Sequence, residues 1–120
     1  MEVLIAPRAR KDIATILAWT LENFGLQITK RYANLIATAI EDVGAEPNLA
    51  GSTARPELAN GCRAYHLFHS RKRAGKPGNR IRSPRHFLLY RVIEAGVVEI
   101  GRLLHDSMEL DQHLPEEYRG

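Results

Sequence analysis

The sequence predicts an α+β domain in which a short strand and an antiparallel pair of helices precede a small antiparallel sheet. Apolar residues recur at helical spacing up to residue 44, and from residue 63 they gather in short runs typical of strands. The 120 residues are 44 % hydrophobic, enough for one core. We therefore expect a single domain over residues 1–120 in the order β-α-α-β-β-β, with a short C-terminal helix.

The N-terminal half contains one short strand and two helices. Residues 3–5 are apolar, and Pro7 suits the first turn of the helix that follows. The apolar face of this helix consists of Ile13, Ile16, Leu17, Thr20, Leu21 and Phe24. Gly25 is expected to end it, and Gly44 and Pro47 end the second helix. The buried stripe of the second helix consists of Ile28, Tyr32, Leu35, Ile36, Ala39, Ile40 and Val43. Two amphipathic helices joined by about two residues predict an antiparallel hairpin.

The C-terminal half is predicted to form the sheet. Residues 47–61 are rich in Pro, Gly, Asn and Ser and indicate a loop. Strands are expected over residues 63–68, 87–93 and 97–104, with a glycine-containing turn at 94–96. Because no helix separates these strands, they should pair antiparallel, and the helices should cover one face of the sheet.

The residues after the last predicted strand resemble an active site in composition. Asp106 is followed three positions later by Glu109, a pattern typical of a helix N-terminal capping box. We therefore predict a short helix over residues 107–113, ended by Pro115. His105, Asp106 and Ser107 are too close in sequence to converge as a catalytic triad, whose members come from separate parts of a fold.

The same segment raises the question of a metal site. His105, Glu109 and His113 are spaced by four and would align on a continuous helix. The capping pattern places His105 on the strand instead, so no metal site, cofactor or catalytic residue is predicted. Cys62 is the only cysteine, which excludes an internal disulfide, and it is interpreted as a small buried residue.

A basic loop over residues 70–85 makes the whole chain basic. Seven of the 17 Lys and Arg residues lie there, without any acidic residue, whereas the rest of the chain holds ten basic and 14 acidic residues. The seven are Arg71, Lys72, Arg73, Lys76, Arg80, Arg82 and Arg85. Such a cluster attracts phosphate, although it contains no aromatic side chain for base stacking. The alternatives are a solvated insertion, a nucleic-acid contact or a docking site for an acidic partner.

Trp19 is a candidate binding residue. It lies off the apolar stripe of the first helix, so it is expected either to be an exposed anchor for a partner or to pack under the 47–61 loop. Phe24 is assigned to the core. No apolar run approaches 18 residues and no secretory signal precedes the first helix, so a cytoplasmic protein without a membrane span is expected.

Several segments resemble a known family. They are residues 6–13 (APRARKDI), the helical pair with Trp19 and Phe24-Gly25, residues 87–92 (FLLYRV) and residues 98–114 (VEIGRLLHDSMELDQHL). Together they resemble the ParE branch of the RelE/ParE toxin superfamily, and the run 102–114 is the most specific part. The basic loop departs from the family, in which this connection is usually shorter.

The resemblance implies a cytoplasmic toxin encoded beside a ParD-like antitoxin, with which it forms a hetero-oligomer. ParE-type members inhibit DNA gyrase, so we expect binding to the gyrase A subunit with DNA. The expected target contacts are Arg102, His105, Met108 and His113. The antitoxin is expected to cover the helical hairpin, including Trp19, and the open sheet edge. The basic loop would contact DNA held by gyrase or an acidic antitoxin.

Two alternative functions remain open. RelE-type members cut messenger RNA on the ribosome, and this chain offers polar residues on or near the sheet for such chemistry. These residues are Arg63, His66, Tyr90, Arg91, Arg102 and His105. Tyr118 lies beyond Pro115, so only His105 would fill the catalytic role near the C-terminus. The third possibility is a non-toxic member that only binds its antitoxin.

Overall fold

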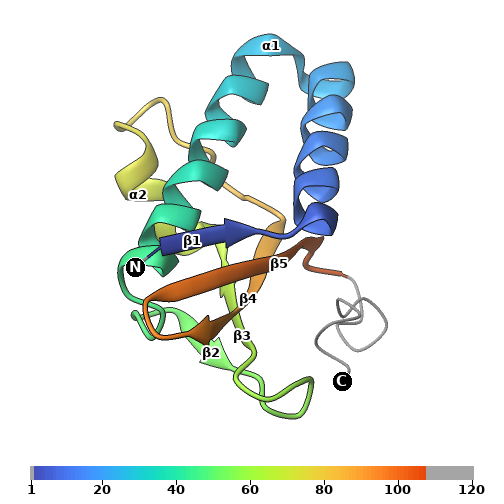
Figure 1. Ribbon diagram of the computed structural model, residues 1–120. Coiled ribbons are helices and arrows are strands. Elements are labelled where there is room, and N and C mark those ends of the chain that lie inside the picture. The colour runs from blue at the N-terminus through green and yellow to red at the C-terminus, as the bar shows by residue number, and fades with distance from the viewer. Residues whose placement is uncertain (1, 108–120) are drawn as a thin grey trace.

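The computed structural model, which describes residues 2–107, contains a five-stranded sheet with a long bent helix over one face (Figure 1). The strands are β1 (Glu2–Ile5), β2 (Ser52–Ala54), β3 (Arg63–His66), β4 (His86–Glu94) and β5 (Val97–His105). The helices are α1 (Pro7–Ala45), the short 3-10 helix η1 (Leu67–Ser70) and α2 (Arg71–Ala74). This arrangement confirms the α+β class. No helix of this part of the chain is long and apolar enough to cross a membrane.

The sheet is mixed, in the order β1-β5-β4-β3-β2. The last three predicted strands pair antiparallel as expected, but β1 pairs parallel with β5, so the predicted purely antiparallel sheet is wrong. Parallel neighbours need a long crossover connection, and residues 6–96, which contain α1 and the strands β2 to β4, supply it here. A further strand, β2, forms within residues 47–61, which were predicted to be a loop.

The predicted hairpin of two separate helices is also wrong. One helical element, α1, runs from Pro7 to Ala45 and is bent at Gly25, whose φ of 85° and ψ of 175° are not helical. Glycine adopts positive φ without steric cost, so a single residue redirects the chain where a two-residue junction was expected. The two arms of α1, residues 7–24 and 26–45, lie on either side of this bend (Figure 1).

The second arm of α1 supplies most of the helical part of the core. Its buried side chains match the predicted stripe and include Tyr32, Leu35, Ile36, Ala39 and Val43. They pack against Leu88, Tyr90, Val98, Ile100 and Leu103 of the sheet. The first arm is buried only at Ala9 and Thr20, while Ile13, Ile16 and Leu17 are partly buried.

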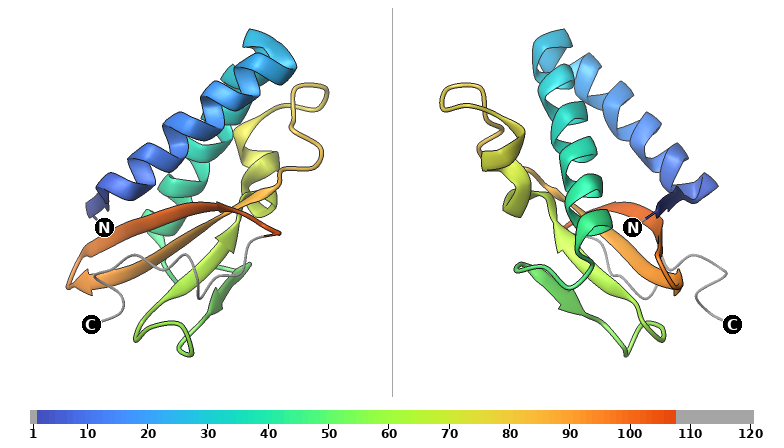
Figure 2. Two further views of the ribbon diagram at one scale, coloured as in Figure 1. Left: turned by 90° about the vertical axis from the view of Figure 1, so that its right-hand side faces the viewer. Right: turned by 60° about the vertical axis from the view of Figure 1, so that its left-hand side comes forward.

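The bent end of α1 stands away from the sheet (Figure 2). Leu21 and Phe24 were predicted to belong to the buried face, but they are 48 % and 60 % exposed. The helical spacing was correct, but the sheet does not extend far enough to cover this part of the helix. The molecule therefore leaves large apolar side chains exposed around the bend.

A buried ion pair joins the first arm of α1 to β5. Arg102 Nε and Nη2 lie 2.7 and 3.0 Å from the two carboxylate oxygens of Asp12, and the backbone N–H of Leu103 donates to the same carboxylate at 3.0 Å. The two side chains are only 9 % and 13 % exposed. Asp12 thus satisfies three donors at once and fixes α1 against the sheet.

Only the start of the segment after β5 lies within the described residues. Asp106 and Ser107 lie in a turn, and the rest of the helix predicted over residues 107–113 lies outside that range, as does Glu109 of the predicted capping box. The carboxylate of Asp106 accepts hydrogen bonds from Arg85 and His66. These partners are distant in sequence and belong to the ends of neighbouring strands.

Candidate functional site

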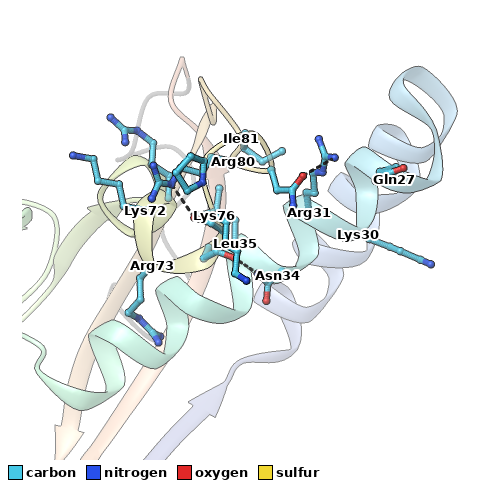
Figure 3. A pocket seen from close by; sticks show the side chains of 15 residues that line it. Gln27, Lys30, Arg31, Asn34, Leu35, Lys72, Arg73, Lys76, Arg80 and Ile81 are labelled. Atoms are coloured by element: carbon cyan, nitrogen blue, oxygen red, sulfur yellow. Dashed lines mark hydrogen bonds between the residues drawn. The ribbon is translucent and has the colours of Figure 1, made fainter.

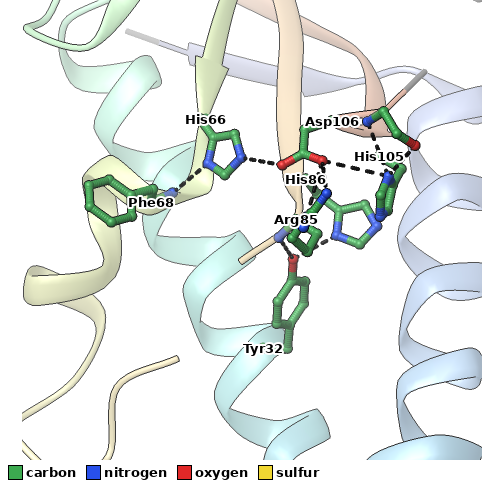
Figure 4. Close-up of polar contacts among 8 residues, drawn as sticks. Tyr32, His66, Phe68, Arg85, His86, His105 and Asp106 are labelled. Carbon is green, nitrogen blue, oxygen red and sulfur yellow. Dashed lines mark hydrogen bonds and ion pairs between the residues drawn. The ribbon is translucent and has the colours of Figure 1, made fainter. Parts of the chain in front are cut away.

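A cluster of titratable side chains lies where β3, β4 and β5 end beside α1 (Figure 4). We refer to it as the polar cluster; its members are Tyr32, His66, Arg85, His86, His105 and Asp106. Strand register assembles it, since His86 pairs with His105 and His66 pairs with Phe87. The ring centroids of His86 and His105 are 5.3 Å apart.

Asp106 connects two basic side chains within the polar cluster. Its Oδ1 accepts from Nε and Nη2 of Arg85 at 3.1 and 3.0 Å, and its Oδ2 lies 3.1 Å from Nε2 of His66. Burial alone would raise the pKa of Asp106, but the hydrogen bonds from His66 and Arg85 outweigh it and the pKa lies below its ordinary value. Asp106 is therefore ionised at neutral pH and holds the ends of β3, β4 and β5 together.

His86 and Tyr32 form the inner part of the polar cluster. The hydroxyl of Tyr32 lies 2.6 Å from Nδ1 of His86 and accepts from the backbone N–H of Arg85 at 3.2 Å. Burial lowers the pKa of His86 to about 4, helped by the nearby His105, and burial raises the pKa of Tyr32 to about 12. At neutral pH both groups are uncharged, so the hydroxyl of Tyr32 donates a hydrogen bond to Nδ1 of His86.

The low pKa of His86 predicts a loss of stability in weak acid. The unfolded chain binds a proton at His86 near pH 6.5, whereas the folded chain binds it only near pH 4. Stability should therefore fall as pH drops from about 6.5 to 4, by up to about 3 kcal/mol from this group. Urea unfolding at several pH values measures the loss. His86→Asn keeps an acceptor for Tyr32 but does not titrate, so its stability should depend less on pH in this window; an unchanged dependence would contradict the assignment.

His105 lies close to its sequence neighbours. Its Nδ1 lies 2.7 Å from Oγ of Ser107 and 3.7 Å from Oδ1 of Asp106. The three side chains do not have the geometry of a triad. A triad needs the serine and the acid on opposite ring nitrogens, and here both approach Nδ1.

Most sheet residues considered for RNA cleavage are bound within the fold. Tyr90 is fully buried and donates to the carbonyl of Pro47 at 2.6 Å. Arg63 donates to Oγ of Ser52 at 2.8 Å, and Arg91 lies 3.5 Å from Glu99 on the neighbouring strand. Arg102 is buried against Asp12. Among the candidates, His66 and His105 remain beside solvent at the polar cluster.

Several cations of the predicted basic loop have partners within the fold. Arg73 pairs with Glu41 and Asp42, and Arg85 pairs with Asp106. The guanidinium of Arg71 lies 4.0 Å from the ring centroid of Phe68, and Arg80 donates to the carbonyl of Gly75 at 2.8 Å. Residues 70–85 also contain α2, which sequence composition did not indicate.

Part of this loop forms a cleft with the second arm of α1 (Figure 3). We call it the basic cleft; it encloses about 670 Å³. Its charged lining residues are Lys30, Arg31, Arg71, Lys72, Arg73, Lys76 and Arg80. The sequence prediction missed Lys30 and Arg31, which helical spacing places with Gln27 and Asn34 on one face of α1.

An apolar groove of about 500 Å³ lies between the two arms of α1 and the ends of β4 and β5. Its lining side chains include Ile16, Trp19, Phe24, Ile28 and Tyr32, with His86 and His105 at one end. Trp19 is 56 % exposed, so the alternative in which it packs under the 47–61 loop is wrong. It contacts Phe24 edge-on, with ring centroids 5.7 Å apart, and the assignment of Phe24 to the core is also wrong.

Two of the predicted target contacts cannot be located in the fold. Met108 and His113 lie outside the described residues, as does Glu109 of the rejected metal spacing. Residues 2–107 contain no group of His, Cys, Asp and Glu side chains suited to a metal ion. Cys62 is buried as predicted, and burial raises the pKa of its thiol to about 11, which makes it a poor nucleophile.

Comparison with known proteins identifies the family. A family model described as the ParE toxin of the type II toxin–antitoxin system parDE matches residues 3–110. The search of curated proteins gave no match. The matched span contains both arms of α1, all of β2 to β5 and the whole polar cluster. The resemblance stated from the sequence is thereby confirmed, and the chain belongs to the ParE toxin family of type II toxin–antitoxin systems.

Proposed function

We propose that this ParE toxin inhibits DNA gyrase by binding to its A subunit with DNA, and that a ParD-like antitoxin neutralises it. The observation that carries a binding mechanism is the engagement of Tyr90 and Arg102. Both side chains are buried and hold the fold together, so they are not offered to an RNA substrate. With these two side chains committed to the fold, binding through the molecular surface is the mechanism we favour.

The proposed target surface lies at the end of β5. His105 is partly exposed there, and Met108 and His113 follow it in the sequence. Arg102 is buried, so its proposed part is to hold β5 in place through Asp12 and thereby to position His105. Under this assignment, β5 is a fixed support for the target surface, and His105 is a partly exposed polar side chain on that surface.

The apolar groove is the proposed binding site of the antitoxin. Trp19 and Phe24 are more than half exposed and lie edge to face on one wall. An amphipathic helix or extended segment with apolar anchors would fill such a groove. Free sheet edges at β1 and β2 offer a second place for main-chain pairing.

A gyrase assay tests the proposed function. Purified toxin is expected to abolish supercoiling and to accumulate cleaved DNA bound to gyrase, and added antitoxin should restore supercoiling. His105→Ala should weaken inhibition, whereas His69→Ala, a change at another exposed histidine, should not. Unaffected gyrase together with new cuts in cellular messenger RNA would reject the proposal. No growth arrest on induction would point to a member that only binds its antitoxin.

Ribosome-dependent cleavage of messenger RNA is the second candidate function, and the polar cluster favours it. His66, His105 and Arg85 lie beside solvent near an ionised Asp106 and a neutral His86. Histidines and an arginine at this spacing could exchange a proton and hold a phosphate. Mapping cut sites in messenger RNA from cells expressing wild-type toxin or His105→Ala distinguishes this chemistry from gyrase binding.

A further inference from the structure

We propose that the basic cleft binds the phosphate backbone of duplex DNA without reading its sequence. The inference deepens the proposed function and rests on it, because a toxin bound to gyrase with DNA would have duplex DNA beside it. It concerns a surface apart from the end of β5 and from the apolar groove. The cleft lies at the basic loop that the sequence analysis singled out.

The cleft is positively charged on both of its walls. Lys30 and Arg31 come from the second arm of α1, and Lys72, Lys76 and Arg80 come from α2 and the residues after it (Figure 3). Within the part of the chain that the structure describes, no acidic residue lines it. Several uncompensated cations around one hollow favour a polyanion over a single carboxylate.

The hydrogen bonds that shape the cleft leave its charge in place. Arg31 donates to the side-chain oxygen of Asn79 at 3.2 Å, and Arg80 donates to the carbonyl of Gly75 at 2.8 Å. Asn34 donates to the carbonyl of Ala74 and connects α1 with α2. These acceptors are uncharged, so they hold the two walls together without neutralising the positive charge of Arg31 and Arg80.

Three lysines are available for ligand contact. Lys30, Lys72 and Lys76 are exposed, and within residues 2–107 no carboxylate lies within ion-pair distance of them. Arg73 differs, because Glu41 and Asp42 hold its guanidinium at 2.7 and 2.8 Å. Two kinds of cation therefore line the cleft. Arg73 forms ion pairs that support the fold, whereas the three lysines form no ion pair within residues 2–107.

The lining favours duplex DNA over other polyanions. It contains no aromatic side chain, so it provides nothing on which the bases of a single strand would stack. Of its two large apolar residues, Leu35 is buried and Ile81 is partly buried, so a folding acidic peptide would find little apolar surface to anchor it. Cations and the amides of Gln27 and Asn34 suit phosphate oxygens, which a duplex presents without unstacking.

The test is duplex binding by the purified chain, followed by fluorescence anisotropy over a range of salt concentrations. The variant Lys72→Gln/Lys76→Gln removes two cations from the cleft. Arg8→Gln/Lys11→Gln removes two exposed cations from the first arm of α1, outside the cleft, and is the matched control. We expect the cleft variant to bind about tenfold more weakly near 0.1 M salt, with a slope of log K against log salt that is shallower by about 1.8.

Each outcome decides for or against the cleft. A larger loss in the cleft variant than in the control supports it. Equal losses would assign binding to net charge, and tighter binding of single-stranded DNA or of a poly-glutamate peptide would assign a different ligand; each would overturn the inference. Gyrase inhibition without DNA binding overturns the inference and leaves the proposed function standing, whereas DNA binding without gyrase inhibition does the reverse.

Discussion

Replacing Asp12 by alanine is expected to lower the free energy of unfolding by about 3–5 kcal/mol, the largest single-residue effect anticipated here. The change leaves the buried guanidinium of Arg102 without its carboxylate and removes the acceptor of the Leu103 N–H. Removing one partner of a buried ion pair costs more than the lost attraction alone, because the other charge stays buried. Urea unfolding of the purified chain, followed by circular dichroism, measures the loss.

The double variant Asp12→Leu/Arg102→Met provides the control. It removes both charges and keeps apolar volume at the junction of α1 and β5, so much of the stability should return. If Asp12→Ala cost less than about 1 kcal/mol, as exposed ion pairs do, the pair would not have the buried role described above. If the double variant were as unstable as the single variant, lost packing and not the unpaired charge would be responsible.

Trp19→Ala is expected to weaken antitoxin binding by at least about 2 kcal/mol, or roughly 30-fold. The indole lies against Phe24 on the wall of the apolar groove, and a large aromatic side chain in such a place contributes most of its contact area on binding. Calorimetric titration with the antitoxin measures the affinity. In cells, the same change should leave growth arrested although antitoxin is present.

Leu26→Ala is the matched control for this prediction. Leu26 is 59 % exposed, similar to Trp19, but it does not line the groove. Because both side chains are exposed, neither change should move the urea midpoint appreciably. Equal effects of the two changes on affinity would show that general apolar surface, not the groove, receives the antitoxin.

Local periodicity was enough to predict the parts of the fold that depend on it. The stripe from Tyr32 to Val43 is buried as expected, because helical spacing alone decides which side faces a sheet. Spacing does not report how far the sheet extends, so Leu21 and Phe24 were wrongly assigned to the core. The three residues of β2 have too short and polar a pattern to be recognised without their partner β3.

The candidate site was harder to predict because its contacts join residues that are distant in sequence. Asp106 has a capping pattern with Glu109, yet its carboxylate binds Arg85 and His66, 21 and 40 positions away. Composition showed seven cations together but not that Arg73 would find Glu41 and Asp42 on α1. Only the three-dimensional arrangement shows which arginines form ion pairs within the fold and which lysines are exposed for ligand contact.

The strand order also determines when the toxin can fold during its synthesis. Among the strands of residues 2–107, β5 is the last to leave the ribosome, yet it lies inside the sheet between β1 and β4. Until residue 105 has been made, β1 lacks the strand with which it pairs and Asp12 lacks Arg102. Contacts of such high sequence separation form late and slowly, so a nascent chain completes this sheet only after β5 has been made.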